Sequence, residues 1–196
     1  MWKQKLIDFA KKLEHPAWGF SHFTRVYEMS LNIAEKQGIE VDHDALFAAA
    51  YLHDMGAFEP YRQKNKDHAD SAVESSEELL NSIGFPIEKI PSVKDIIKNH
   101  MYYAKPSNQK ESIIFRDADI LDFLGIIGIT RILSIVGIDD WAPDLKSAIK
   151  LIKSFQKSLP EKLYTEQAKI ISKKRQIEMK EFLNQLSEET NNYSLL

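Results

Sequence analysis

Hydrophobic residues recur along this chain at intervals of three and four, the spacing that places them on one face of an α-helix. The pattern predicts helices over residues 2–14, 21–36, 43–54, 68–83, 90–102, 111–124, 144–158 and 161–187. The helix over 111–124 is expected to continue, with a kink at Gly125 and Gly128, towards Val136. No segment shows the two-residue alternation of a β-strand. The pattern therefore predicts an all-α fold, a single-domain helical bundle over residues 1–196.

Residues that cap or interrupt helices set the expected boundaries. Ser21 and Asp42 are suited to N-cap positions, and Gly38 and Gly84 to helix ends. Pro86 and Pro91 are expected to bracket a short connection, because proline cannot continue a helix. Residues 57–67 are polar and charged and predict a loop.

Five of the predicted helices each bring histidine or aspartate to an otherwise apolar face. In chain order these residues are His22, the doublet His53-Asp54, His68, His100 and Asp117. Desolvating such groups costs free energy unless something pairs with them. Each lies near one end of its helix, where a side chain reaches the rim of a bundle. A divalent cation shared among them would satisfy all of them at once, which indicates a metal-centred hydrolase.

The alternative is that each of these residues has a private hydrogen-bond partner. A single histidine on an apolar face is more often a hydrogen-bonded core residue than a ligand. Four histidines and a buried aspartate would each need a separate partner, because buried polar groups are rarely left unpaired. His15 and His43 lack the pattern and are left out of the predicted site.

Composition narrows the chemistry further. The 196 residues carry a formal net charge of -3, so no global basic field points to a nucleic-acid polymer. Cysteine is absent, which leaves nitrogen and oxygen as the only metal ligands and excludes a thiolate nucleophile. The N-terminal residues lack the pattern of an export signal, and no apolar run is long enough to span a bilayer. A cytoplasmic protein without membrane contact is therefore expected.

The order and spacing of these residues resemble the HD-domain superfamily, whose name comes from a His-Asp doublet. The matching segments are SHFTRVYEMS, AAAYLHDMG, DHADSAVESSEELL, IIKNH and RDADILDFLG. Two later segments, GIIGITRIL and KLYTEQAKIISKKRQIEMKEFLNQL, are similar to small bacterial HD phosphohydrolases of the YedJ-like kind. The resemblance covers roughly residues 15–187, with an HD core over about 15–136 and C-terminal helices over about 144–187.

The resemblance implies a core metal set of His22, His53, Asp54 and Asp117. His68 and His100 match the two further ligands of binuclear members, in which Asp54 would bridge the metals. We therefore expect one or two divalent transition metal ions, and imidazole and carboxylate suit Mn, Fe, Co, Ni or Zn. The expected reaction is hydrolysis of a phosphate ester by a metal-activated hydroxide that Asp54 orients.

Two departures from the motifs of the family narrow the range of expected substrates. Cyclic-dinucleotide phosphodiesterases of the superfamily follow the doublet with Ile-Gly-Lys and carry a Gly-Tyr-Pro motif. Here Met55-Gly56-Ala57 follows the doublet, and Gly-Tyr-Pro is absent. The mononuclear 5′-nucleotidases use a glutamate three residues after the aspartate of the doublet, and Ala57 occupies that position. We therefore expect neither cyclic-dinucleotide hydrolysis nor the acid/base scheme of the mononuclear 5′-nucleotidases in this chain.

Cations near the ligands are candidates for substrate contact. Arg25, one helical turn after His22, suits a phosphate group but equally suits a surface ion pair with Glu28. Lys105 follows His100 closely enough to reach the same opening. A further cationic group, Arg62, Lys64 and Lys66, forms either a mobile electrostatic lid or an ordinary solvated run.

Asp119 and Asp122 are expected to support the ligating histidines from outside by accepting their other ring N–H. The expected substrate is a nucleotide or another small phosphorylated metabolite. Two alternatives stay open: a di-iron oxygenase of the same superfamily, which uses the same six ligands, and a non-catalytic HD domain that binds a ligand and signals.

Overall fold

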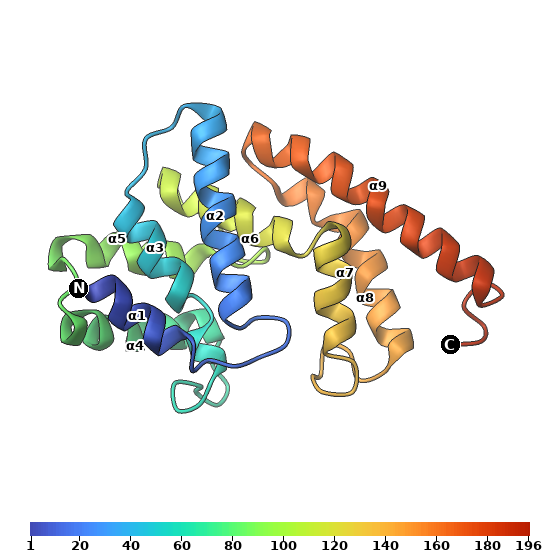
Figure 1. Ribbon diagram of the computed structural model, residues 1–196, viewed down its shortest axis with the longest axis horizontal. Coiled ribbons are helices and arrows are strands. Elements are labelled where there is room, and N and C mark those ends of the chain that lie inside the picture. Colours follow the sequence, from blue (N-terminus) through green and yellow to red (C-terminus); the bar gives the residue numbers. More distant parts are fainter. The chain divides into compact units, whose positions relative to one another are not determined.

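The computed structural model describes residues 1–196, and its regular structure is entirely helical (Figure 1). The α-helices are α1 Trp2–Ala10, α2 Phe20–Gln37, α3 His43–Leu52, α4 His68–Ile83, α5 Ile90–Asn99, α6 Lys110–Asp122, α7 Gly125–Ser134, α8 Leu145–Ser158 and α9 Glu166–Glu189. Three short 3₁₀ turns are η1 Met55–Ala57, η2 Ile87–Lys89 and η3 Pro160–Lys162. The all-α prediction is confirmed. None of the helices combines the length and the apolar character that a membrane span requires.

The chain forms two compact units, Met1–Asp119 and Ile120–Leu196. In the first unit α3 is the central helix, and it packs against α1, α2 and α5. All its residues from Ala45 to Leu52 are buried, as expected of a helix that is apolar on every side. α4 packs against α5 and η1. The first unit therefore surrounds the helix that ends at the His53-Asp54 doublet.

The second unit contains α7, α8 and α9, which pack against one another (Figure 1). α8 buries one face, formed by Ala148, Ile149, Ile152 and Phe155, so its apolar spacing is that of an amphipathic helix. The chain passes from the first unit to the second within α6, after Asp119. The predicted single domain with a core over residues 15–136 stays a prediction.

Several predicted helix ends are found in the structure. The Asp42 carboxylate accepts hydrogen bonds from the backbone N–H groups of Asp44 and Ala45 and caps α3. α2 and α4 end at Gly38 and Gly84, as predicted. The loop predicted over residues 57–67 joins η1 to α4.

Other boundaries differ from the prediction. The N-cap of α2 is Gly19 rather than Ser21, because the carbonyl oxygen of Gly19 accepts the N–H groups of His22 and Phe23. Pro91 lies in the first turn of α5, where its missing N–H costs nothing. The first and last helices are shorter than predicted, since α1 ends at Ala10 and α9 begins only after the turn η3.

The predicted kinked helix beyond residue 124 is also wrong. α6 ends at Asp122, and α7 begins at Gly125, whose φ of +74° is a left-handed conformation that favours glycine. A left-handed residue interrupts the helical hydrogen bonds rather than bending them, so the chain forms two separate helices here.

Candidate metal centre

Five helix ends of the first unit bring together five of the six predicted ligands and one further carboxylate. His22 lies in the first turn of α2, and His68 is the first residue of α4. His53 and His100 are the C-cap residues of α3 and α5, and Asp54 follows His53 directly. Asp119, in the last turn of α6, completes the group. Apart from His68, which is partly exposed, these side chains are buried.

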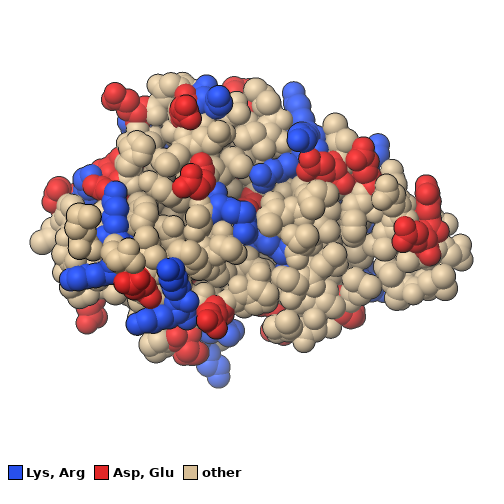
Figure 2. All heavy atoms as spheres, viewed as in Figure 1, with Lys and Arg blue, Asp and Glu red and all other residues tan.

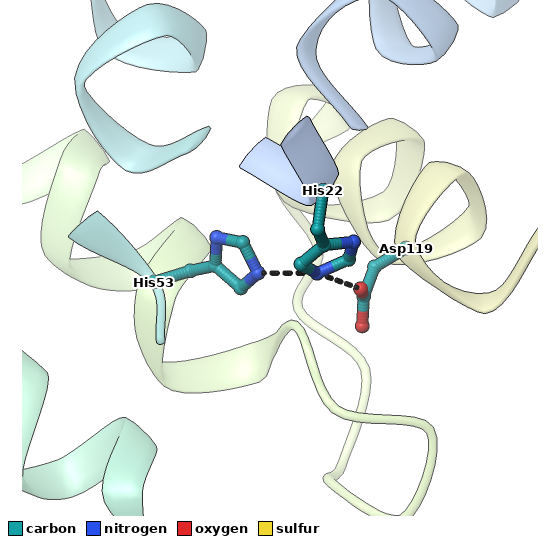
Figure 3. A group of neighbouring side chains, drawn as sticks. All are labelled: His22, His53 and Asp119. Atoms are coloured by element: carbon teal, nitrogen blue, oxygen red, sulfur yellow. Dashed lines mark hydrogen bonds and ion pairs between the residues drawn. The ribbon is translucent and has the colours of Figure 1, made fainter. Parts of the chain in front are cut away.

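One half of the cluster contains His22, His53 and Asp119 (Figure 3). The Nε2 atom of His22 lies 3.1 Å from Nε2 of His53 and 3.3 Å from Oδ1 of Asp119. Oδ2 of Asp54 faces the same point, 3.2 Å from Nε2 of His53 and 3.5 Å from Nε2 of His22. The ligand atoms of His22, His53 and Asp119 therefore lie within 4.8 Å of one another, and Asp54 approaches both imidazole rings.

The other half of the cluster contains His68 and His100. Their Nε2 atoms lie 3.4 Å apart. Oδ1 of Asp54 is 3.4 Å from Nε2 of His68 and 3.5 Å from Nε2 of His100. The two oxygens of the Asp54 carboxylate thus face two different histidine pairs, which is the geometry of a bridging carboxylate.

Backbone carbonyl groups fix the ring orientation of two of these histidines. Nδ1 of His53 donates to the carbonyl oxygen of Ala50 at 2.9 Å, and Nδ1 of His100 donates to that of Ile97 at 2.7 Å. These carbonyl groups belong to the last turns of α3 and α5, where helical partners run out. Because a carbonyl oxygen only accepts, each neutral ring carries its proton on Nδ1 and points a lone pair from Nε2 into the cluster.

The charge state of the cluster also favours a cation. Burial lowers the pKa of His53, which keeps its ring neutral. Burial alone would raise the pKa of Asp54 and Asp119, but the neighbouring histidines hold both below the ordinary value. Ionised carboxylates and neutral imidazole nitrogens are the ligand types that bind divalent transition metal ions.

Two observations test whether a metal ion fits. Ligand atoms about 2.1 Å from a cation with tetrahedral angles lie about 3.4 Å from one another, and the distances between atoms here are 3.1–3.5 Å. In addition, Oδ2 of Asp119 is buried without a hydrogen-bond partner. Such an oxygen is costly to leave unpaired. The groups His22–His53–Asp119 and His53–Asp54–His100 fit a divalent cation.

Asp119 is the carboxylate of α6 that the structure brings into the cluster. The sequence predicted Asp117 as a ligand and Asp119 as a supporting residue, but Oδ1 of Asp119 lies 3.3 Å from Nε2 of His22. Residues two apart on a helix point about 200° from each other, so only one of the two can face the cluster. α6 is buried almost all round, from Ile114 to Asp122, so its apolar spacing carried no signal for which side meets the histidines.

Three further predicted residues have the following places. Asp122 forms an ion pair with Arg131, at 3.0 Å. Arg25 is half-buried on α2, and Lys105 is exposed between α5 and α6. The assignment of Arg25 and Lys105 to substrate contact stays a prediction.

A cavity of about 690 Å³ lies beside the loop that precedes His68. Its lining residues are Glu59, Arg62, Gln63, Lys64, Asn65, Lys66 and Asp67. Lys66 is paired with Glu74. On the face in Figure 2, basic side chains are interspersed with acidic ones. The predicted cationic loop therefore borders a hollow large enough for a small molecule.

A family comparison now assigns the fold. The HD domain model matches residues 19–124, which include every side chain of the cluster. This chain belongs to the HD domain family. No functionally curated protein matches it.

Solved structures agree with the HD assignment. A predicted HD superfamily hydrolase from an uncultured Thermotogales bacterium is 26% identical, with a TM-score of 0.65 and 95% and 90% of the two chains covered. A Lactobacillus plantarum protein is 21% identical, with a TM-score of 0.71 and 97% of each chain covered. Bacillus subtilis YpgQ in complex with ADP is 22% identical, with a TM-score of 0.68 and 95% and 97% covered. The buried His/Asp cluster is thus the candidate metal site of an HD domain.

Proposed function

We propose that this HD protein is a metal-dependent phosphohydrolase that cleaves a phosphate ester of a nucleotide or another small phosphorylated metabolite. The observation that carries the proposal is the Asp54 carboxylate, whose two oxygens face two histidine pairs at 3.2–3.5 Å. That arrangement supports two cations sharing one carboxylate. The resemblance to small bacterial phosphohydrolases of the YedJ-like kind supports the same class of reaction.

The proposed ligand set follows the two halves of the cluster. His22, His53 and Asp119 would hold one ion, His68 and His100 would hold the other, and Asp54 would contact both. Asp119 replaces Asp117 in the proposed ligand set, because its buried Oδ2 has no hydrogen-bond partner. Imidazole and carboxylate ligands suit Mn, Fe, Co, Ni or Zn.

The chemistry is divided between the ions and the chain. Divalent cations held there would lower the pKa of water towards neutrality and polarise a phosphoryl oxygen. Asp54 would orient the attacking water by accepting a hydrogen bond from it. Its lowered pKa keeps the carboxylate ionised and therefore a hydrogen-bond acceptor. The carbonyl groups of Ala50 and Ile97 keep the Nε2 atoms of His53 and His100 free of protons.

Phosphate oxygens that do not contact a cation need donors from the chain. Arg25 and Lys105 remain the proposed substrate contacts, and the cavity beside the 59–67 loop adds Arg62 and Lys64. Both of these loop cations are exposed, and neither takes part in the ion pair that holds Lys66. Because the YpgQ structure contains ADP, nucleotides are the first compounds to assay.

Metal analysis combined with a phosphate-release assay tests the proposal. Untagged protein purified without chelator should contain one or two transition metal ions per chain and release phosphate or a phosphorylated product from nucleotides. Asp54→Asn should abolish this release and retain the helical circular dichroism spectrum. Wild-type turnover by Asp54→Asn, or no metal after incubation with Mn²⁺ and Co²⁺, would contradict the proposal. Iron with oxygen-dependent turnover would indicate the oxygenase instead.

A further inference from the structure

His68 differs from His53 and His100 in what faces its second nitrogen. His53 and His100 each donate from Nδ1 to a backbone carbonyl group three residues earlier. His68 is the first residue of α4, so no preceding helical turn offers such a carbonyl. Its Nδ1 instead lies 3.7 Å from Oδ1 of Asp67, an ion-pair distance. A carboxylate rather than a backbone carbonyl group therefore faces this nitrogen.

Asp67 is itself held from two sides. Its Oδ1 accepts the backbone N–H of Ala69 at 2.8 Å and caps α4. Its Oδ2 accepts the hydroxyl group of Tyr103 at 2.8 Å. Hydrogen bonds thus fix both oxygens of the carboxylate beside His68.

Tyr103 reaches Asp67 from a segment that α6 holds in place. A guanidinium nitrogen of Arg116, on α6, donates to the carbonyl oxygen of Tyr102 at 2.9 Å. Arg116 is buried, whereas the Tyr103 residue is 53% exposed. An exposed tyrosine gains little from burying its ring, so its directed hydroxyl contact is the feature that needs an explanation.

We propose that Asp67 and Tyr103 are positioning residues for His68. Tyr103 holds the Asp67 carboxylate beside Nδ1 of His68, which keeps the ring proton there and directs the Nε2 lone pair to the point shared with Asp54 and His100. The pair does for His68 what carbonyl groups do for His53 and His100. This inference rests on the proposed metal function, because Nε2 of His68 is one of its ligands.

The exposure of His68 explains why its ring would need positioning residues. The His68 side chain is 23% exposed, whereas those of His22 and His53 are 1% exposed. A partly exposed ring at a helix start is less restrained by packing than a buried one. Carboxylates that orient ligating histidines typically affect metal affinity by about 10- to 100-fold. Replacing Asp67 or Tyr103 should therefore weaken the affinity for the metal ion that His68 would hold. The affinity for the ion that His22 would hold should stay unchanged.

Calorimetric titration of metal-free protein with Co²⁺ tests this inference. In Tyr103→Phe and Asp67→Asn, the weaker of two binding steps should weaken about tenfold, while the tighter step stays unchanged. Asparagine remains a good N-cap, so Asp67→Asn removes the charge and keeps the cap of α4. Tyr61→Phe is the matched control, because the ring of Tyr61 packs against Phe9 away from Asp67. His68→Gln should lose the weaker step entirely.

A second measurement uses no metal. Nitrogen-15 NMR of the metal-free protein, at an alkaline pH where the ring is neutral, should find the His68 proton on Nδ1 in the wild type and a mixture of both tautomers in Asp67→Asn. Wild-type affinity for the second ion together with an unchanged tautomer would overturn the inference. A wild-type protein that binds one ion only would overturn it too, while leaving the proposed hydrolysis intact. Failure to bind any ion would overturn the proposed function itself.

Discussion

Gly56 lies so close to the first turn of α4 that a Cβ atom at this position would stand 2.1 Å from the carbonyl oxygen of His68. The same atom would stand 2.7 Å from the backbone nitrogen of Ala72. Only a residue without a side chain lets η1 pack against α4 in this way. Because Asp54 is two residues earlier, this contact also sets the 3.4 Å separation between Asp54 and His68.

Gly56→Ala is therefore expected to separate η1 from α4 and to weaken the second metal position. Overpacking of this kind costs about 1–3 kcal/mol in the free energy of unfolding. Chemical denaturation would measure that cost, and Co²⁺ titration would show whether the weaker binding step is lost.

Gly38→Ala provides the matched control. Gly38 has a φ of +64° with open space around it, so alanine there costs about 1 kcal/mol of backbone strain without touching the cluster. Both binding steps should survive in Gly38→Ala. Equal loss of metal binding in the two variants would show that general destabilisation, rather than the spacing between Asp54 and His68, causes the effect.

Asp119→Asn and Asp117→Asn distinguish the two assignments of the last ligand. Asp119→Asn should remove the tighter binding step, because it takes the charge from the oxygen that faces His22. Asp117→Asn should keep the metal stoichiometry and lower stability by about 1–3 kcal/mol, as expected when a buried, partnered carboxylate is replaced. Metal analysis after dialysis measures the first effect, and thermal unfolding measures the second. Loss of metal in Asp117→Asn alone would restore the assignment made from sequence.

The sequence predicted most of the helices because each has one apolar face. The boundary at Asp42 was predictable from capping chemistry, and the ends at Gly38 and Gly84 from glycine. The separation of α6 from α7 was not predictable, because a glycine within an apolar helical pattern is compatible with either a kink or a helix end. The left-handed φ of Gly125 is set by the folded chain.

The ligand residues show the same division. His22, His53, His68 and His100 stood out because each was a lone polar residue on an apolar face. On α6 that signal fails, because Arg116, Asp117, Asp119 and Asp122 are all buried and the helix has no polar face for comparison. Only the position of α6 against the other helix ends distinguishes Asp119 from Asp117. The contact between Tyr103 and Asp67 joins loops 36 residues apart and left no periodic pattern.

Asp54→Asn should lower both stability and function. In the metal-free protein the neighbouring histidines hold the pKa of Asp54 well below its ordinary value, so the ionised carboxylate stabilises the folded chain. Metal-free Asp54→Asn should therefore unfold at a lower temperature than the metal-free wild type. A saturating cation should stabilise the wild type by about 4 kcal/mol at a thousandfold excess over its dissociation constant, and the variant far less. Paired calorimetric scans with and without Mn²⁺ measure both effects, and a higher unfolding temperature for the metal-free variant would contradict this stabilising role of the carboxylate.

Removing the loop cations should weaken substrate binding without slowing chemistry. Arg62 and Lys64 border the cavity that residues 59–67 line, and exposed charges of this kind contribute about 0.2–1 kcal/mol each. Arg62→Ser and Lys64→Ser should each raise KM for a nucleotide substrate by about 1.5- to 5-fold with kcat unchanged, and the effect should shrink as salt screens the charges.

Lys36→Ser is the matched control for Lys64→Ser, because it changes net charge equally. Lys36 lies 14 residues beyond His22 on α2, which is about 21 Å along the helix axis. It should leave KM unchanged at every salt concentration. If Lys36→Ser and Lys64→Ser raise KM alike, the loop contributes only to the overall field of the protein. A fall in kcat for Lys64→Ser would instead mean that the loop acts in the transition state.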